Sequence, residues 1–175
     1  TLPPAEQAAQ VFQAFVDQLA FASMDFSHVI RTWFYNEDII PWYGEFNNVR
    51  NKYFTLWDTY CGLVPASTGV GGHNAAGTAL MTGLLALVPK NDEVSAFAVP
   101  SPLQCPAIEY GSSFSRAVET VYPSFRRMTI SGTASICPDG ETMFLDDTRA
   151  QIVRTLDVVD GILDSRGMKW TDTTR

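Results

Sequence analysis

Two amphipathic stretches near opposite ends of the chain constrain its fold more than any other feature of the sequence. In residues 5–24 and 148–170, apolar residues recur every three or four positions along one side, which is typical of a helix packed on a core. Pro4 stands at the start of the first stretch, where a helix tolerates proline in its first turn. Asp146 or Asp147 is in position to cap the second. We therefore predict a helix in each place.

The two predicted helices also match each other in sequence. When Gln7 is aligned with Gln151, the same offset pairs further residues: Phe12 with Leu156, Phe15 with Val159, Leu19 with Leu163, Met24 with Met168 and Arg31 with Arg175. This match favours two related αβ units in tandem, residues 1–98 and 99–175. The first unit would lack its leading strands and the second its closing strands. The alternative is a chance match, since helical patterning alone makes such matches common.

The segments between the two helices predict further helices and strands. Residues 28–36 are rich in β-branched and aromatic side chains and predict a strand, as does the apolar run 78–89. Residues 40–57 predict another helix, with aromatic residues for contacts. The runs 112–121 and 125–136 are strand-like and are separated by a Tyr-Pro-Ser turn signal. Helices and strands are thus mixed along the chain.

The charge of the chain argues against a nucleic-acid partner. The formal net charge is −7, and the basic residues cluster only in the dipeptide Arg126–Arg127. A general nucleic-acid binder needs a cationic surface, because phosphate contacts supply most of its non-specific affinity. We therefore expect no nucleic acid among the partners of this protein.

The cysteines and the apolar runs indicate where the protein resides. Cys61, Cys105 and Cys137 lie far apart and form no Cys-x-x-Cys pair, which argues against a disulfide framework and fits a reduced, cytoplasmic setting. The longest apolar stretch, around Ala79–Pro89, is too short to span a membrane, and no signal peptide is recognisable. We expect a cytoplasmic protein without a membrane segment.

Familiar catalytic and cofactor motifs are missing from the sequence. It contains no Gly-x-Ser-x-Gly elbow, no His-Glu-x-x-His motif and no Walker loop. The glycine-rich run 69–77 has Asn74 where a dinucleotide-binding motif needs its third glycine, so we interpret this run as a loop between strands. His28 and His73 stand alone, without acidic residues at ligand spacing. We expect neither a metal site nor a cofactor.

Four acidic residues crowd into residues 137–147, and their position has a structural explanation. Asp139 and Glu141 belong to a turn, and Asp146 and Asp147 stand at the start of the last predicted helix, where the helix dipole favours negative charge. We prefer this interpretation to a catalytic pair of carboxylates.

The stretch SPLQCPAIEYGSSFSRAVE, residues 101–119, combines a tyrosine, several serines and an arginine. On a strand, alternate side chains face the same way, so Ser113 and Ser115 would share one face, and Phe114 and Arg116 the other. Gly132 in the following run marks a place where a ligand or a backbone approaches closely. The small residues would leave a hydroxyl-lined hollow beside an arginine that suits a carboxylate. Alternatively, they simply permit tight packing between sheets or subunits.

These segments resemble a known superfamily. YGSSFSRAVE, RRMTISGTASICPDG and the helix DDTRAQIVRTLDVVDGILDSRGMKWTDTTR are similar to the RidA/YjgF superfamily, also called the endoribonuclease L-PSP family. SHVIRTWFYNEDIIPWYGEFNNVRNKYF, VPASTGVGG and SPLQCPAIEYGSSFSR make the chain resemble, more specifically, the chorismatases, which are chorismate hydrolases built from two RidA-like halves. The resemblance covers residues 5–175, and its most specific part is residues 99–136.

The resemblance implies a fold, an assembly and a reaction. The fold would be α+β, of the YjgF/chorismate-mutase-like type, with a mixed sheet, helices on one face, and tandem or permuted units. The assembly would be a homotrimer or pseudo-trimer with sites between units. The reaction would hydrolyse the enol ether of chorismate, or of a related enolpyruvyl acid, and release pyruvate. The residues implied in binding this small carboxylic acid are Tyr110, Ser113, Ser115 and Arg116, with Gly132, Thr133 and Ala134 on a facing strand.

Two departures from the family pattern keep other functions open. The catalytic glutamate of chorismatases lies in a closing strand, beyond Arg175, so the general acid is not identified here. Ser67 replaces the arginine that the RidA imine deaminases use, which argues against deamination. The alternatives are a RidA-type imine or enamine deaminase that scavenges reactive intermediates, and a non-catalytic trimer that binds small acids. With alanine at position 134, the chain resembles the chorismatase subtype whose product is the diol acid.

Overall fold

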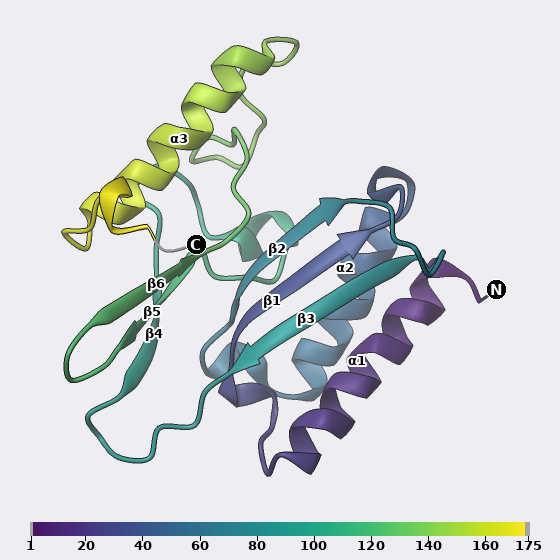
Figure 1. Ribbon diagram of the computed structural model, residues 1–175. Helices are drawn as coiled ribbons and strands as arrows, with labels where there is room; N and C mark the ends of the chain where they lie inside the picture. The colour runs from purple at the N-terminus through teal and green to yellow at the C-terminus, as the bar shows by residue number, and fades with distance from the viewer. Residues whose placement is uncertain (1, 174–175) are drawn as a thin grey trace.

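The computed structural model describes residues 2–173, which form two three-stranded sheets with three α-helices packed on them (Figure 1). The first sheet has the order β2-β1-β3. Its strands are β1 (Val29–Asn36), β2 (Ala66–Gly71) and β3 (Leu80–Ala86). β1 is parallel to β2 and antiparallel to β3. This mixed α+β arrangement agrees with the fold class predicted from the sequence.

Helices α1 (Pro4–Phe21) and α2 (Ile39–Leu56) cover one face of the first sheet. Pro4 lies in the first turn of α1, as the sequence predicts, because the missing amide hydrogen costs nothing there. Phe12 of α1 packs against Phe34 of β1, with ring centroids 5.7 Å apart, and Phe34 packs against Phe46 of α2 at 4.9 Å. Aromatic packing of this kind supplies most of the core, which fixes the position of α2 relative to the sheet.

The second sheet is entirely antiparallel and has the order β4-β5-β6. Its strands are β4 (Ser95–Val99), β5 (Ala117–Val121) and β6 (Arg126–Ile130). Helix α3 (Thr148–Asp164) packs on one face. Asp147 caps α3, because its Oδ1 accepts a hydrogen bond from the amide of Ala150 at 2.9 Å, which confirms one of the two predicted caps.

The two sheets meet at one corner, where their backbones share hydrogen bonds. The amide of Ser115 donates to the carbonyl of Pro65 at 3.0 Å, and the amide of Gly132 donates to the carbonyl of Ser67 at 2.9 Å. Arg31 adds a bond from its Nη1 to the carbonyl of Ile130 at 2.9 Å. This corner holds the segment 112–116 against the first sheet.

The backbone contacts at this corner explain why two predicted strands are shorter than expected. The runs 112–121 and 125–136 were expected to be strands over their whole length, but β5 begins at Ala117 and β6 ends at Ile130. Beyond these points one more bond joins the two segments, from the amide of Ser131 to the carbonyl of Arg116, and the backbone then bonds to the first sheet. Within the run 69–77, residues 69–71 belong to β2 and not to a loop.

Strand β4 was not predicted at all, because it is short and follows a polar loop. The predicted boundary between residues 98 and 99 falls inside β4, which pairs with β5. The division into two related units stays a prediction, and Arg175, which the alignment pairs with Arg31, lies outside the described residues. No helix among residues 2–173 is long and apolar enough to cross a lipid bilayer.

Candidate functional site

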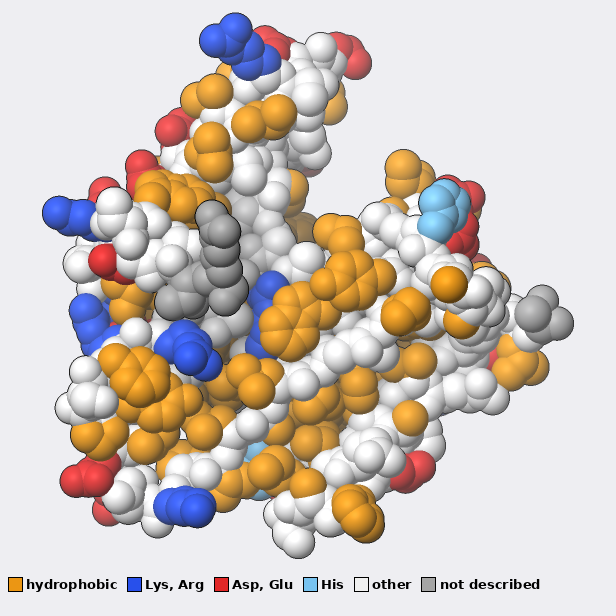
Figure 2. Space-filling model, in the orientation of Figure 1, with side chains coloured by type: hydrophobic (Ala, Val, Ile, Leu, Met, Phe, Trp, Pro, Cys, Tyr) orange, Lys and Arg blue, Asp and Glu red, His pale blue; other side chains and the backbone are white. Residues whose placement is uncertain are grey.

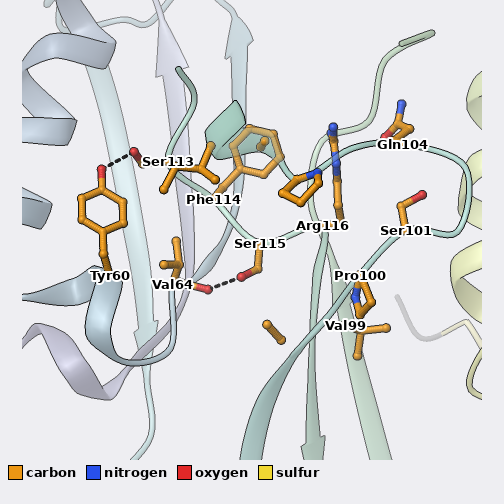
Figure 3. Close-up of a pocket in the computed structure, with 14 residues that line it drawn as sticks. Tyr60, Val64, Val99, Pro100, Ser101, Gln104, Ser113, Phe114, Ser115 and Arg116 are labelled. Carbon is orange, nitrogen blue, oxygen red and sulfur yellow. Dashed lines mark hydrogen bonds between the residues drawn. The ribbon is translucent and has the colours of Figure 1, made fainter. Parts of the chain in front are cut away.

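A cavity of about 270 Å³ opens beside the corner where the two sheets meet (Figure 3). Its wall comes from the end of β4, the loop that follows it, the short helix η2 (Thr59–Cys61), and the segment 113–116. Most of the lining is apolar. The polar side chains on the wall are those of Tyr60, Ser101, Gln104, Ser113, Ser115 and Arg116. A mostly apolar hollow with a few converging polar groups is typical of a small-molecule site.

Arg116 is the cationic group on the wall of this cavity. Its side chain is buried, and its Nε and Nη2 both donate to the carbonyl of Cys105, at 2.9 Å and 2.6 Å. The guanidinium carbon lies 5.3 Å from the ring centroid of Tyr110 and 5.5 Å from that of Phe114. These contacts fix the plane of the guanidinium and leave the hydrogens of Nη1 without a protein partner among those that the structure describes.

A second buried arginine, Arg50, lies near Phe114 and outside the cavity lining. Its guanidinium carbon is 6.0 Å from the ring centroid of Phe114, so two guanidinium groups lie near this ring. Arg50 is 2% exposed, and its Nη2 donates to Asn47 Oδ1 at 2.7 Å. Its Nε is buried without a hydrogen-bond partner. Burial lowers the pKa of Arg50, against the opposing effect of the nearby hydroxyl of Tyr43.

Sequence reasoning missed Arg50, although the sequence contains a signal for it. The buried residues of α2 are Trp42, Phe46, Arg50 and Phe54, each four positions after the last. Helical neighbours at this spacing share one face, so Arg50 occupies an apolar stripe where a charge is costly. A charge in such a stripe indicates a functional site or a buried ion pair.

Neither of these arginines has a carboxylate partner in the part of the chain that the structure describes. The ion pairs among residues 2–173 join Asp25 with His28, Glu37 with His73, and Glu119 with Arg126 and Arg166. Two buried cations thus lie around Phe114 without a compensating negative charge. Such an arrangement is unfavourable unless an anion is bound.

A chain of hydroxyl groups connects the cavity to α2. The hydroxyl of Ser113 donates to Asn51 Oδ1 at 2.6 Å, and the hydroxyl of Tyr60 contacts Ser113 Oγ (Figure 3). Ser115 Oγ donates to the carbonyl of Val64 at 2.6 Å. These bonds fix the serines in place, so the wall is pre-organised.

The structure brings together part of the predicted site. Ser113, Ser115 and Arg116 line the cavity, together with Phe114. The expected alternation of these side chains is wrong, because residues 113–116 precede β5 and do not form a regular strand. Tyr110 packs on Arg116 from outside the lining. Burial raises the pKa of Tyr110, and the neighbouring charge of Arg116 acts in the opposite direction.

The other three predicted residues do not lie on a strand facing this cavity. Gly132 packs on Thr68: a Cβ at position 132 would lie 3.1 Å from Thr68 Cγ2. Thr133 lines a separate groove between β6 and the end of α3, and Ala134 lines a groove along α3. The expected facing strand is absent here because β6 ends at Ile130. Their proposed role in substrate binding stays a prediction.

Two of the other polar residues singled out from the sequence, Asp139 and His28, have partners close to them in the chain. Asp139 accepts a hydrogen bond from the amide of Glu141 at 3.2 Å, which makes it part of a turn. His28 Nδ1 lies 3.1 Å from Asp25 Oδ1. Within residues 2–173, no group of three or more histidine, cysteine, aspartate or glutamate residues is arranged to hold a metal ion.

Comparison with known proteins shows the fold. No family model and no curated protein matches the chain. The chain is similar to the crystal structure of a chorismatase, with a TM-score of 0.67 and 23% sequence identity. The match covers 91% of this chain and 48% of that one, so the chain spans about half the length of the chorismatase. The α+β fold of residues 2–173 is therefore similar to part of a chorismatase.

Proposed function

We propose that the cavity binds a small carboxylic acid, and that the protein hydrolyses the enol ether of chorismate or a related enolpyruvyl acid. The observation that carries this proposal is the pair of buried arginines near Phe114: Arg116 lines the cavity, and Arg50 lies outside its lining. The likeness to the fold of a chorismatase supports the choice of substrate.

The electrostatics of the cavity support an anionic ligand. A buried guanidinium without a carboxylate partner loses its hydration and gains little in return, so a bound carboxylate relieves the cost. Arg116 is held by the carbonyl of Cys105 through two of its nitrogens and has Nη1 left for a ligand. A charge-assisted hydrogen bond from Nη1 to a carboxylate oxygen is about twice as strong as a neutral one. Arg50, whose guanidinium carbon is 6.0 Å from the ring centroid of Phe114, adds positive potential nearby.

The reaction needs a proton donor as well as cationic groups. Protonation of the enolpyruvyl methylene carbon makes the neighbouring carbon electrophilic, water adds there, and the hemiketal breaks to give pyruvate and an alcohol. The cavity wall described here contains no carboxylic acid. Burial raises the pKa of Tyr110, so this phenol holds its proton and is a poor acid. The resemblance assigns the acid to a glutamate of a closing strand, and the residues that line this cavity would bind and orient the substrate.

Pyruvate release tests this proposal. Wild-type protein is incubated with chorismate, and pyruvate is followed by a coupled lactate dehydrogenase. We expect release above the spontaneous rate, and a loss of at least tenfold in Arg116→Met, which removes one charge-assisted hydrogen bond. Lys52→Met is the matched control, because it removes an exposed positive charge from α2, away from the cavity lining. Equal rates in all three proteins would refute the assignment of this cavity.

One observation favours a second function, an acid-binding protein without catalysis. The described wall offers cationic and hydroxyl groups but no carboxylic acid to protonate a substrate. This alternative predicts that chorismate binds stoichiometrically without pyruvate release, which calorimetry beside the coupled assay distinguishes. Deamination is less well supported, because Ser67 is buried in the sheet and bonded to Thr32 at 2.9 Å.

We also propose that the chain associates with copies of itself, as the resemblance to a trimeric family implies. The face of the first sheet that looks away from α1 and α2 carries exposed apolar side chains, among them Tyr35, Val70 and Met81. Figure 2 shows apolar side chains gathered over this part of the surface. Large exposed apolar patches are typical of interaction sites.

A further inference from the structure

We infer that the outer edge of β6 binds an extended acidic segment of a partner protein, which adds to the second sheet as a fourth strand. β6 is the last strand in the order β4-β5-β6 (Figure 1). It borders a groove of about 690 Å³ that runs between β6 and the end of α3. This groove shares no lining residue with the cavity that holds Arg116, so the inference does not depend on the proposed function.

The hydrogen bonds to β5 show which backbone groups of β6 point outward. The amide of Ser131 donates to the segment that leads into β5, so Ser131 belongs to a bonded pair. Bonded and non-bonded pairs alternate along an antiparallel ladder, so the next residues of β6 that bond to β5 are Thr129 and Arg127. The amides and carbonyls of Arg126 and Met128 therefore point away from β5.

These outward groups have no partner among residues 2–173. β6 pairs with β5 alone, and no turn or loop within this range bonds to the amide or carbonyl of Arg126 or Met128. A row of unpaired amides and carbonyls on an edge strand is a template for a further strand. When an extended peptide is added to a sheet in this way, main-chain hydrogen bonds supply the affinity.

The floor of the groove is apolar. Met128 and Ile130 pack into the core between the sheet and α3, so these alternate residues of β6 face the helix. Val159 and Leu163 of α3 also line the groove, as does Trp170, which is about half exposed. An added strand would cover these side chains with every second residue of its own, and those residues have to be apolar.

The rim of the groove carries unpaired positive charge. Arg126 pairs with the buried Glu119, whereas Arg127 and Lys169 have no carboxylate partner in the described part of the chain. The acidic residue of the lining, Asp172, accepts a hydrogen bond from the amide of Lys169 at 2.9 Å. The rim is therefore complementary to a negatively charged segment.

The alternation of side chains along a strand specifies the occupant. Residues of the added strand that face α3 have to be apolar, and those on the other face lie on the side of Arg127, which favours acidic ones. A second copy of β6 does not fit, because it would bring Arg126 and Arg127 of both copies together, and like charges across a pair of strands are destabilising. The expected segment alternates apolar and acidic residues.

Amide hydrogen exchange, followed by NMR, tests the backbone part of the inference. The probe is the acetylated and amidated peptide Glu-Val-Glu-Val-Glu-Val. In the free protein the amides of Arg127 and Thr129 should exchange slowly and those of Arg126 and Met128 quickly. Saturating peptide should slow the exchange of Arg126 and Met128 by at least about tenfold. If these two amides are already protected in the free protein, or if the peptide leaves them unchanged, the inference is wrong.

Calorimetry tests the charge part. A peptide with lysine in place of each glutamate should bind at least about tenfold more weakly, because several exposed charge pairs become repulsive. Arg127→Glu should weaken the acidic peptide about fivefold. Lys90→Glu is the matched control, because Lys90 is exposed in the loop between β3 and β4, outside the groove, and it should keep the wild-type affinity.

The comparison of the two peptides needs no variant, so it decides the question even if Arg127→Glu does not fold. Equal binding of the acidic and basic peptides would overturn the charge argument and the inference with it. Binding of neither peptide would also overturn it, and the arginines of β6 would then serve only to keep this edge from pairing.

Discussion

Replacing Arg50 by methionine should make the protein more stable and a poorer binder of acids. The guanidinium of Arg50 is 2% exposed, has no carboxylate partner among residues 2–173, and has an unpaired Nε. Methionine has a similar length, fills the space between Phe46 and Phe114, and has a comparable helix propensity. The substitution removes the desolvation cost of the charge and loses one hydrogen bond to Asn47.

The magnitude follows from these opposing terms. Replacing buried charges by apolar residues of similar volume stabilises proteins by about 1–4 kcal/mol, and the lost hydrogen bond to Asn47 costs about 1 kcal/mol. We therefore expect the free energy of unfolding to rise by up to about 3 kcal/mol. For a domain of this size, each kcal/mol raises the Tm by about 2–4 °C. Affinity for benzoate, a small carboxylic acid used as the probe, should fall about tenfold, because the positive potential near Phe114 is lost.

Urea denaturation and calorimetry measure both effects in the same proteins. Lys52→Met is the control: Lys52 is exposed on the same helix, so its loss should change stability by less than about 0.5 kcal/mol and leave acid affinity intact. If Arg50→Met is less stable than the wild type, the contacts of the guanidinium with the aromatic rings offset its desolvation cost in the wild-type protein. The argument for an anion site is then wrong. Higher stability with unchanged affinity would place Arg50 outside the site.

Three further predictions concern Arg116, Glu119 and Tyr35. Arg116→Lys should lose the paired bonds to the carbonyl of Cys105 and weaken benzoate binding about tenfold in calorimetry; full affinity would show that any cation suffices. Glu119→Gln should lower the free energy of unfolding by about 1–3 kcal/mol in urea without altering acid affinity, because the buried carboxylate pairs with two partly exposed arginines outside the cavity lining. Tyr35→Glu should reduce the sedimentation coefficient if copies associate through the first sheet; an unchanged value would exclude this face.

The helices and strands β1 and β3 could be predicted from the sequence because their signals are local. The apolar stripe of α1, with Phe12 and Phe15, is a periodic pattern within one segment, and so is that of β1. The cap at Asp147 is similarly local, since the side chain bonds three residues along the chain. Such features depend on residues close together in the chain, so the sequence predicts them whatever the rest of the fold is.

The site was only partly predictable, because contacts distant in sequence determine it. Ser115 and Gly132 leave their strands to bond with Pro65 and Ser67, and nothing near them in sequence announces these partners. The pattern of residues 101–119 pointed to Ser113 and Arg116, the resemblance implied the same residues, and both line the cavity. Arg50, by contrast, has a local signal, because it is a charged residue at a position of α2 where the four-residue spacing predicts an apolar one.

The most direct test of the account is a crystal structure of the protein soaked with chorismate. The account predicts a carboxylate of the ligand within hydrogen-bond distance of Arg116 Nη1, inside the cavity beside Phe114. A ligand bound elsewhere, or an empty cavity at a saturating concentration, would contradict the claim that the two buried arginines form an acid-binding site.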